Sequence, residues 1–415
     1  MINSVERKQD VISIISSLDI TPTMYKNACD KYNALATFLN SHGVNADIYP
    51  QGSFAIGTVV KPIANSSNAN YDLDFICQLE GDKNDFSPSE LCNKLINCLS
   101  NSDIYKDKLK ADQVCVTIEY AEINEIGFSV DIVPAADETV ENKTRLINMS
   151  DYPYLIDSSI AIPKHNGERN YSWITNNPRG ITKWFKDINE PFLVCSRKEY
   201  RKLLFENNRN VFDSIEEIPT ELERSPLQRV IQILKIHRNI HYSKFKNGDD
   251  IKPISAIITV LAAQIGSNHK PNCSVFELLE YVLNELNKYS SLLKKSNLNT
   301  YCYSSINNII SLKDGKWSIE NPANPEDNLA DKWNKNSEIP SRFFSWIKTV
   351  KVDLIDSLLL TDSEFRASLE NGFGNNQVSK VLNEKYCGSS KLKPILIKAA
   401  PKPYGELWFL VKIQH

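Results

Sequence analysis

The chain lacks the patterns of a membrane protein, a disulfide framework and a thiolate zinc site. Its most apolar window, residues 254–265, is too short to span a bilayer, which needs about 20 residues. The nine cysteines are odd in number and contain no C-x-x-C pair. The first residues show no apolar core of a signal peptide. We therefore expect a cytoplasmic protein that does not contact a membrane.

A charge excess of one sign is also lacking. The chain has 48 basic and 51 acidic residues, which gives a formal net charge of -3. This balance does not indicate a protein with an extended nucleic-acid surface, but it is compatible with a local basic groove. With 415 residues, of which 41% are hydrophobic, the chain can bury a substantial core and is long enough for two or three domains.

The first third of the chain has the pattern of an α/β unit. Thr21 is a candidate helix cap, Pro22 suits the first turn, and Gly43 is a candidate stop after a helical stripe of apolar residues. From about residue 46 the spacing of the apolar residues changes from the helical period to every second residue. This alternation predicts strands over 72–79, 114–120 and 127–133.

Helical patterns return after about residue 170. Ser225 and Gln228 form a capping box for a helix over 225–242, and a nearly all-apolar helix follows Lys252 and Pro253. We therefore predict an α+β protein in which a mixed-sheet lobe over 1–170, including the N-terminal helices, precedes a helical lobe over 171–415. The strand-like segment 407–413 has no functional interpretation.

An Asp-x-Asp pair lies on the first predicted strand. Strand alternation sends Asp72 and Asp74 to one face, where the two carboxylates become neighbours. Such like charges repel unless water, a base or a cation lies between them. Mg²⁺ prefers oxygen ligands and is typically held by one or two carboxylates plus substrate phosphates. The pair by itself is weak support for a metal site, since it also suits a solvated strand face.

A third carboxylate lies on a later strand. Asp131 stands in the otherwise apolar run 127–133, where an unpaired carboxylate is costly and should have a partner. If the two strands are neighbours, three carboxylates converge and can bridge two cations, as displacement at phosphorus requires. The alternative for Asp131 is a hydrogen bond to a backbone amide at a strand end.

Upstream, the segment QGSFAIGT carries a glycine and serine that can hold an anion through amide and hydroxyl groups. A Gly-Ser pair alone more often marks a turn, and the segment matches neither a P-loop nor a dinucleotide-binding fingerprint. In this order, Gly52-Ser53, Asp72-x-Asp74 and Asp131 resemble the nucleotidyltransferases of the DNA polymerase beta superfamily. These motifs in this order are far more specific for the superfamily than any one of them alone.

Within that superfamily the chain is most similar to bacterial cyclic-oligonucleotide synthases of anti-phage defence, the relatives of cyclic GMP-AMP synthase. The resemblance extends over residues 51–333 and rests on QGSFAIGTVVKP, YDLDFICQL, GFSVDIVPA, SPLQRVIQILKIHRN, KPISAIIT and NPANPEDNLADKW. It implies a polymerase beta-like lobe that makes a cyclic di- or trinucleotide from nucleoside triphosphates, releases pyrophosphate and uses Mg²⁺ or Mn²⁺. It also implies a downstream effector activated by the product, which we expect to contain adenine.

The resemblance further implies roles for individual residues. Asp72, Asp74 and Asp131 would hold the metals, and Gln51, Gly52 and Ser53 would hold the triphosphate. The positions that match a helix lysine and a following serine, which reach the triphosphate in the family, are Lys235 and Ser255.

Other assignments remain open at this stage. Lys235 can equally be a solvated surface charge, and Ser255 can simply cap its helix. His237 and His241 are more easily explained by packing than by a metal site, because Arg238 stands where the zinc-protease pattern needs a glutamate. No Cys/His zinc insertion of the animal DNA sensor is present, so direct DNA sensing is not expected. The enzymatic alternative is a nucleotidyltransferase that extends RNA or modifies a small molecule or protein.

Overall fold

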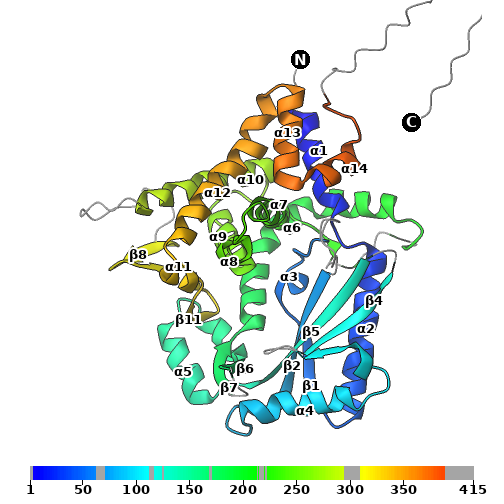
Figure 1. Ribbon diagram of the computed structural model, residues 1–415, viewed down its shortest axis with the longest axis vertical. Coiled ribbons are helices and arrows are strands. Elements are labelled where there is room, and N and C mark those ends of the chain that lie inside the picture. Colours follow the sequence, from blue (N-terminus) through cyan, green and yellow to red (C-terminus); the bar gives the residue numbers. More distant parts are fainter. Residues whose placement is uncertain are drawn as a thin grey trace, which may run out of the picture.

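The computed structural model describes residues 3–61, 71–111, 116–123, 126–167, 171–212, 214, 219, 222–293 and 309–387. In these ranges a mixed sheet and a group of helices lie next to each other (Figure 1). The predicted α+β class is therefore confirmed. No helix of the described ranges combines the length and the apolar content needed to cross a membrane.

The predicted carboxylates lie on two long strands of the main sheet. Its strands are β1 (Ala46–Pro50), β2 (Tyr71–Asp82), β3 (Leu109–Ala111), β4 (Val116–Ile123), β5 (Ile126–Asp137), β6 (Ile160–His165) and β7 (Tyr171–Asn176). Their order is β1-β2-β5-β4-β3, with β6 paired to β5 and β7 to β6. Only the β2–β5 pair is parallel among these pairings, so the sheet is mixed.

The helices fall into those that cover the sheet and those that form a second core. They are α1 (Ser4–Ser17), α2 (Pro22–Ser41), α3 (Gly52–Ala55), α4 (Pro88–Ser100), α5 (Val140–Met149), α6 (Pro178–Asn207), α7 (Pro226–Tyr242), α8 (Gly248–Ile251), α9 (Ser255–Gly266), α10 (Val275–Lys288), α11 (Asp331–Lys335), α12 (Glu338–Leu354), α13 (Asp362–Phe373) and α14 (Asn375–Leu382). Short 3₁₀ turns cover Lys106–Lys108, Pro153–Ser158, Tyr289–Leu293 and Asp356–Leu359.

One face of the sheet is sealed by helices. Alternation along β2 buries Leu73 and Phe75 in a cluster with Leu35 and Leu39 of α2 and Leu95 of α4. The caps that the sequence indicates are present, because the Thr21 side chain accepts a hydrogen bond at the start of α2, and Gly43 has a φ of 79° just beyond its end. The polar residues of β2 are thereby left for the opposite face.

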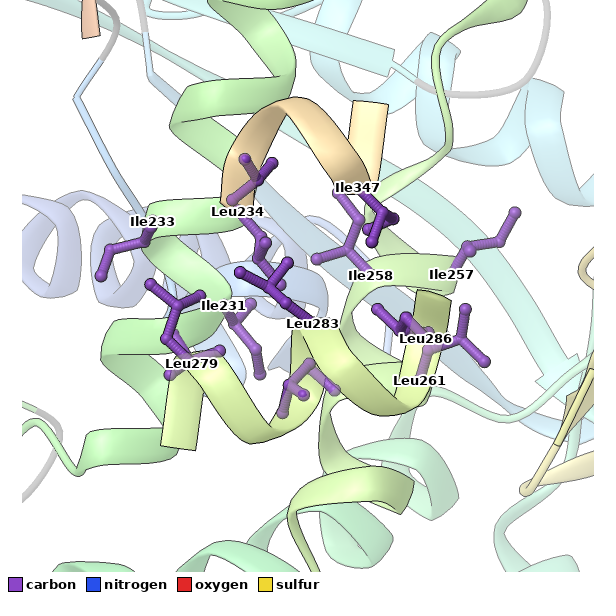
Figure 2. Close-up of a cluster of buried hydrophobic side chains, with 14 of the residues drawn as sticks. Ile231, Ile233, Leu234, Ile257, Ile258, Leu261, Leu279, Leu283, Leu286 and Ile347 are labelled. Atoms are coloured by element: carbon purple, nitrogen blue, oxygen red, sulfur yellow. The ribbon is translucent and has the colours of Figure 1, made fainter. Parts of the chain in front are cut away.

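The second core is built around α7. Ser225 and Gln228 form the predicted capping box, with Pro226 in the first turn. Apolar side chains of α7, α9, α10 and α12 interdigitate in this core (Figure 2). The predicted apolar helix after Pro253 is α9, which is buried on nearly all sides because it packs between α7 and α10.

Packing places the first helix with the last ones. Val11 and Ile14 of α1 belong to the helical core, and α1 lies beside α13 and α14 (Figure 1). The sequence-based division at residue 170 stays a prediction, but the side chains of α1 pack with the later lobe rather than with the sheet. The physical reason is that its apolar stripe packs against α7 and α14, which follow it by more than 200 residues in the chain.

The second half of the chain is not purely helical. β7 pairs with β6, and two small hairpins join β8 (Ser311–Lys313) to β9 (Lys316–Ser318) and β10 (Glu320–Asn321) to β11 (Asn324–Asn328). The strands β2 and β5 are longer than the strands predicted over 72–79 and 127–133. Residues 112–115, where another strand was expected to begin, and the segment 407–413 lie outside the described residues.

Candidate active site

The register between β2 and β5 brings two of the three predicted aspartates together. Asp74 pairs with Asp131 across the parallel ladder, and both are half-buried. Paired residues on neighbouring strands share one face about 4.8 Å apart, so these carboxylates are neighbours. The backbone of Asp72 pairs with Ser129 two residues earlier, while the side chain of Asp72 lies outside the described part of the chain.

Asp131 has the partner that its position in an apolar strand requires. The Thr117 hydroxyl on β4 donates a hydrogen bond of 2.6 Å to Asp131 Oδ1. Thr117 lies directly opposite Asp131 in the antiparallel β4–β5 ladder. This bond holds the carboxylate in position on the strand.

The Gly-Ser turn lies against Asp74. Gln51 donates its backbone N–H to the Asp74 carbonyl at 2.8 Å, and Gly52 follows with a φ of 61°. A Cβ atom added to Gly52 would stand 2.9 Å from Asp74 Oδ2. Glycine is therefore required here both for its backbone conformation and for space. Ser53 is the next residue of the four-residue helix α3 and is half-buried.

Lys235 is buried, and its interpretation as a solvated surface charge is wrong. Only 7% of the residue is exposed, and its Nζ donates to the Thr58 carbonyl at 3.0 Å, just beyond the Gly-Ser turn. Burial lowers the pKa of Lys235 to about 8, with a further lowering from Arg238 and an opposing contribution from Asp74. The lysine thus contacts the loop after the turn and is attracted by Asp74, but the cost of burying its charge is larger than this attraction.

Ser255 does not cap its helix. The N-cap of α9 is Ile254, without a side-chain cap, and Ser255 is the first helical residue. The guanidinium of Arg238 approaches Ser255 Oγ at 3.3 Å and donates to the Pro253 carbonyl at 2.7 Å. Sequence reasoning missed Arg238, although it lies one turn after Lys235 on the same helix.

A cavity of about 420 Å³ opens beside Gly52. Its wall combines the turn with α6, the start of α9 and the segment from β10 to α12, through Gln51, Gly52, Asn176, Pro178, Ile181, Lys252, Pro253, Ile254, Ala256, Ile257, Asn321, Asp327, Asn328, Leu329, Asp331, Lys332, Trp333 and Ile339. Its size is typical of small-molecule sites, and residues from both halves of the chain meet in it.

The two helix histidines serve packing rather than a metal site. His237 is fully buried, 3.1 Å from Asp353 Oδ2, and receives a hydrogen bond from Trp346. Burial lowers the pKa of His241 to about 4. Among the described side chains no group of three or more His, Cys, Asp or Glu residues is placed to hold a metal, but that search does not include the side chain of Asp72.

This arrangement defines a nucleotidyltransferase of the polymerase beta-like fold. A glycine-serine turn, an Asp-x-Asp strand and a further aspartate on the neighbouring strand lie around one site. Residues 7–189 match the Second Messenger Oligonucleotide or Dinucleotide Synthetase (SMODS) domain family. The chain is therefore similar to this family over residues 7–189, and it is an enzyme that joins nucleotides.

Individual relatives agree with this assignment. A c-di-GMP synthase of Roseivirga ehrenbergii is 25% identical over 390 residues, which cover 92% of this chain and 88% of the relative. Among solved structures, the CD-NTase CdnG of Bradyrhizobium diazoefficiens in complex with GTP is 17% identical, with a TM-score of 0.64 over 91% of this chain and 98% of that one. CdnC of E. coli MS115-1 with ATP is 16% identical, with a TM-score of 0.52 over 88% and 97%. The two structures support the fold.

Gly52→Ala should lower the rate of pyrophosphate release by about tenfold or more, because the new methyl group must displace the Asp74 carboxylate. Gly43→Ala is the matched control: its φ is 79°, but a Cβ there meets nothing within 4 Å. That variant should lose about 1–2 kcal/mol of folding stability with unchanged turnover. Equal turnover of the two variants would contradict the contact between Gly52 and the site.

The affinity for a triphosphate should fall as the pH rises through about 8, because Lys235 then loses the charge that attracts phosphate. Lys235→Arg should retain affinity and lose this pH dependence, since arginine does not titrate in that range. Lys235→Met should bind weakly at every pH. Calorimetric titration with the unreactive α,β-methylene analogue of GTP measures all three. A change below about twofold in Lys235→Met, roughly 0.4 kcal/mol, would place the lysine outside the site.

Proposed function

We propose that this enzyme makes a cyclic di- or trinucleotide that contains guanine, and that the product activates a downstream effector in an anti-phage signalling system. The observation that carries the proposal is the pairing of Asp74 with Asp131 beside the Gly52 turn, in a segment that matches the SMODS family. Guanine replaces the adenine expected from sequence because the relative that matches 92% of the chain is a c-di-GMP synthase.

The carboxylates suit a divalent cation. Asp74 and Asp131 offer hard oxygen ligands on one face, and Asp72 precedes Asp74 on β2. Mg²⁺ fits such a donor set, with Mn²⁺ as an alternative. When bound there, the metal would neutralise charge that develops on the phosphate oxygens. The mutual repulsion of the two described carboxylates is the feature that a cation relieves.

The protein side of the reaction is mostly positioning. Gln51, Gly52 and Ser53 hold the triphosphate with Lys235, and Arg238 contacts Ser255, whose neighbours Ile254 and Ala256 line the cavity. The 2′- or 3′-hydroxyl oxygen of a second nucleotide attacks the α-phosphorus. A new P–O bond forms, the bond to the β-phosphate bridging oxygen breaks, and pyrophosphate leaves. Asp131 lies at the attacking hydroxyl and receives its proton.

A nucleotidyltransferase that extends RNA or modifies a small molecule or protein is the enzymatic alternative. Extending RNA calls for a basic track along the acceptor and a strong dependence on salt. The near-neutral net charge of -3 and a cavity of small-molecule size favour a nucleotide acceptor instead. We also propose that activation does not require direct binding of DNA.

The cavity contains a group suited to guanine. Asp331, the exposed first residue of α11, lines the cavity, and its carboxylate has no hydrogen bond or ion pair with the described residues. Guanine presents N1–H and N2–H donors side by side, which one carboxylate accepts together, whereas adenine presents one donor and one acceptor. We therefore propose that Asp331 selects guanine.

Replacing Asp74 or Asp131 by Asn should abolish pyrophosphate release and leave the fold intact. Because like charges repel in the metal-free protein, the Asn variants should melt at the same or a higher temperature than the parent. Asp137→Asn, on the same strand as Asp131 and paired with Lys143 at 2.8 Å, should retain turnover. A large drop in melting temperature for the first two variants would show that these aspartates are structural.

Asp331→Asn should lower the preference for GTP over ATP about tenfold, the lower end of what a bidentate base contact contributes. Inosine triphosphate lacks the N2 amine and should lose affinity in the parent but not in the variant. Asp327→Asn is the control, because Asp327 lines the same cavity but is occupied by Asn321 at 2.9 Å. An unchanged GTP to ATP ratio in Asp331→Asn would assign base selection to another residue.

A further inference from the structure

One face of α7 holds the loop that follows the Gly-Ser turn. Gln228, Gln232 and Lys235 follow one another at intervals of four and three residues, so they share a helix face. Each donates to a main-chain carbonyl of this loop. Gln228 Nε2 bonds Ile56 O at 2.8 Å, Gln232 Nε2 bonds Val59 O at 3.0 Å, and Lys235 Nζ bonds Thr58 O at 3.0 Å.

These bonds are buried on both sides. Gln232 and Thr58 are fully buried, Gln228 is 6% exposed and Val59 is 3% exposed. The loop forms neither helix nor strand over 58–61, so its carbonyls lack regular secondary-structure partners. A buried carbonyl that is left without a hydrogen bond destabilises the fold. The α7 side chains therefore determine where this backbone can lie.

Gly57 shows how closely helix and loop fit. Its φ is 67°, and a Cβ atom placed on it would stand 2.5 Å from Gln228 Nε2. Only glycine allows both the backbone conformation and this approach. Gly57 N donates to Phe54 O, and Thr58 N donates to Ser53 O at 2.9 Å. The loop is therefore continuous in its hydrogen bonds with the α3 turn that carries Ser53.

The two amides are themselves fixed. Gln228 Oε1 accepts from the backbone N–H of Ser225 at 2.9 Å, as part of the helix cap. Gln232 Oε1 accepts from Arg229 at 2.9 Å, while its Nε2 also reaches Asp19 Oδ1 at 3.0 Å. Arg229 pairs with Asp19 at 2.7 Å. Each amide therefore has its oxygen occupied, which directs its N–H groups to the loop.

The loop is held at both ends by different parts of the protein. Gln51 N bonds the Asp74 carbonyl on the sheet at 2.8 Å, and Lys61 N bonds the Leu18 carbonyl after α1 at 2.7 Å. Between these two points, the hydrogen bonds that join the loop to other described elements include the three donated by α7. A loss of one glutamine amide would therefore shift the turn that carries Gly52 and Ser53 relative to Asp74, while Asp331 and the rest of the cavity wall from β10 to α12 stay in place.

We propose that Gln228 and Gln232 are positioning residues for the triphosphate: their amides hold the Ile56 and Val59 carbonyls and so set the turn against the carboxylates. This inference rests on the proposed function of the Gly52–Ser53 turn. It predicts a selective defect, in which contacts to the β- and γ-phosphates weaken and contacts to base and sugar do not.

The test compares two probes by calorimetry, the unreactive α,β-methylene analogue of GTP and GMP. Gln232→Leu and Gln228→Glu should bind the triphosphate analogue at least about tenfold more weakly, with GMP affinity within about twofold of the parent. Gln228→Glu is chosen because glutamate keeps the oxygen that caps α7 and replaces the donated bond to Ile56 by repulsion between two oxygens. Circular dichroism and melting curves show that each variant folds.

Gln377→Leu is the matched control, because Gln377 is an equally buried helix glutamine that donates to Ser17 Oγ at 2.6 Å rather than to a carbonyl of the loop. It should leave both affinities unchanged. Parallel losses for both probes in Gln232→Leu and Gln228→Glu would show a merely structural role and overturn the proposal. Unchanged affinity for the triphosphate analogue would overturn it as well. If the parent protein itself does not bind the analogue, the proposed function fails first, and the two failures are thereby distinguished.

Discussion

The parallel pairing of β2 with β5 places two carboxylates side by side, and much of the surrounding structure accommodates that contact. Asp74 and Asp131 share a register position, which is unfavourable for two like charges unless a cation joins them. The opposite face of β2 is sealed by α2 and α4, so the strand cannot turn its aspartates elsewhere. Thr117 holds one carboxylate, and Gly52 fits against the other.

A buried lysine contributes a positive charge that interacts with these carboxylates. Lys235 lies on α7, in the helical half, and its ammonium group is held on the loop that follows the Gly-Ser turn. Burial lowers the pKa of Lys235 to about 8, so the lysine carries its charge at a cost that an anionic ligand would offset. The sheet thus contributes clustered anions and the helix contributes a desolvated cation. The proposed metal-bound triphosphate would complement both.

Local features were predictable from the sequence, and features that depend on distant pairing were not. The caps at Thr21 and Ser225 follow from residues within one helical turn, and the structure confirms both. The grouping of Asp74 with Asp131, which are 57 residues apart in the chain, required the assumption that their two strands are neighbours in the sheet. The roles of Lys235 and Gln232 depend on a loop more than 170 residues earlier, which no helical periodicity can reveal. The short strands β8 to β11 are too brief for an alternating pattern to register.

The central claim is that the enzyme closes a guanine-containing ring. The most direct measurement is incubation of the purified protein with all four labelled nucleoside triphosphates and Mg²⁺, followed by alkaline phosphatase and mass spectrometry. Cyclisation leaves no terminal phosphate, so the predicted result is a phosphatase-resistant cyclic di- or trinucleotide that contains guanine. Products that are only linear and phosphatase-sensitive, or extension of added RNA, would contradict the cyclase assignment and leave only the broader nucleotidyltransferase activity.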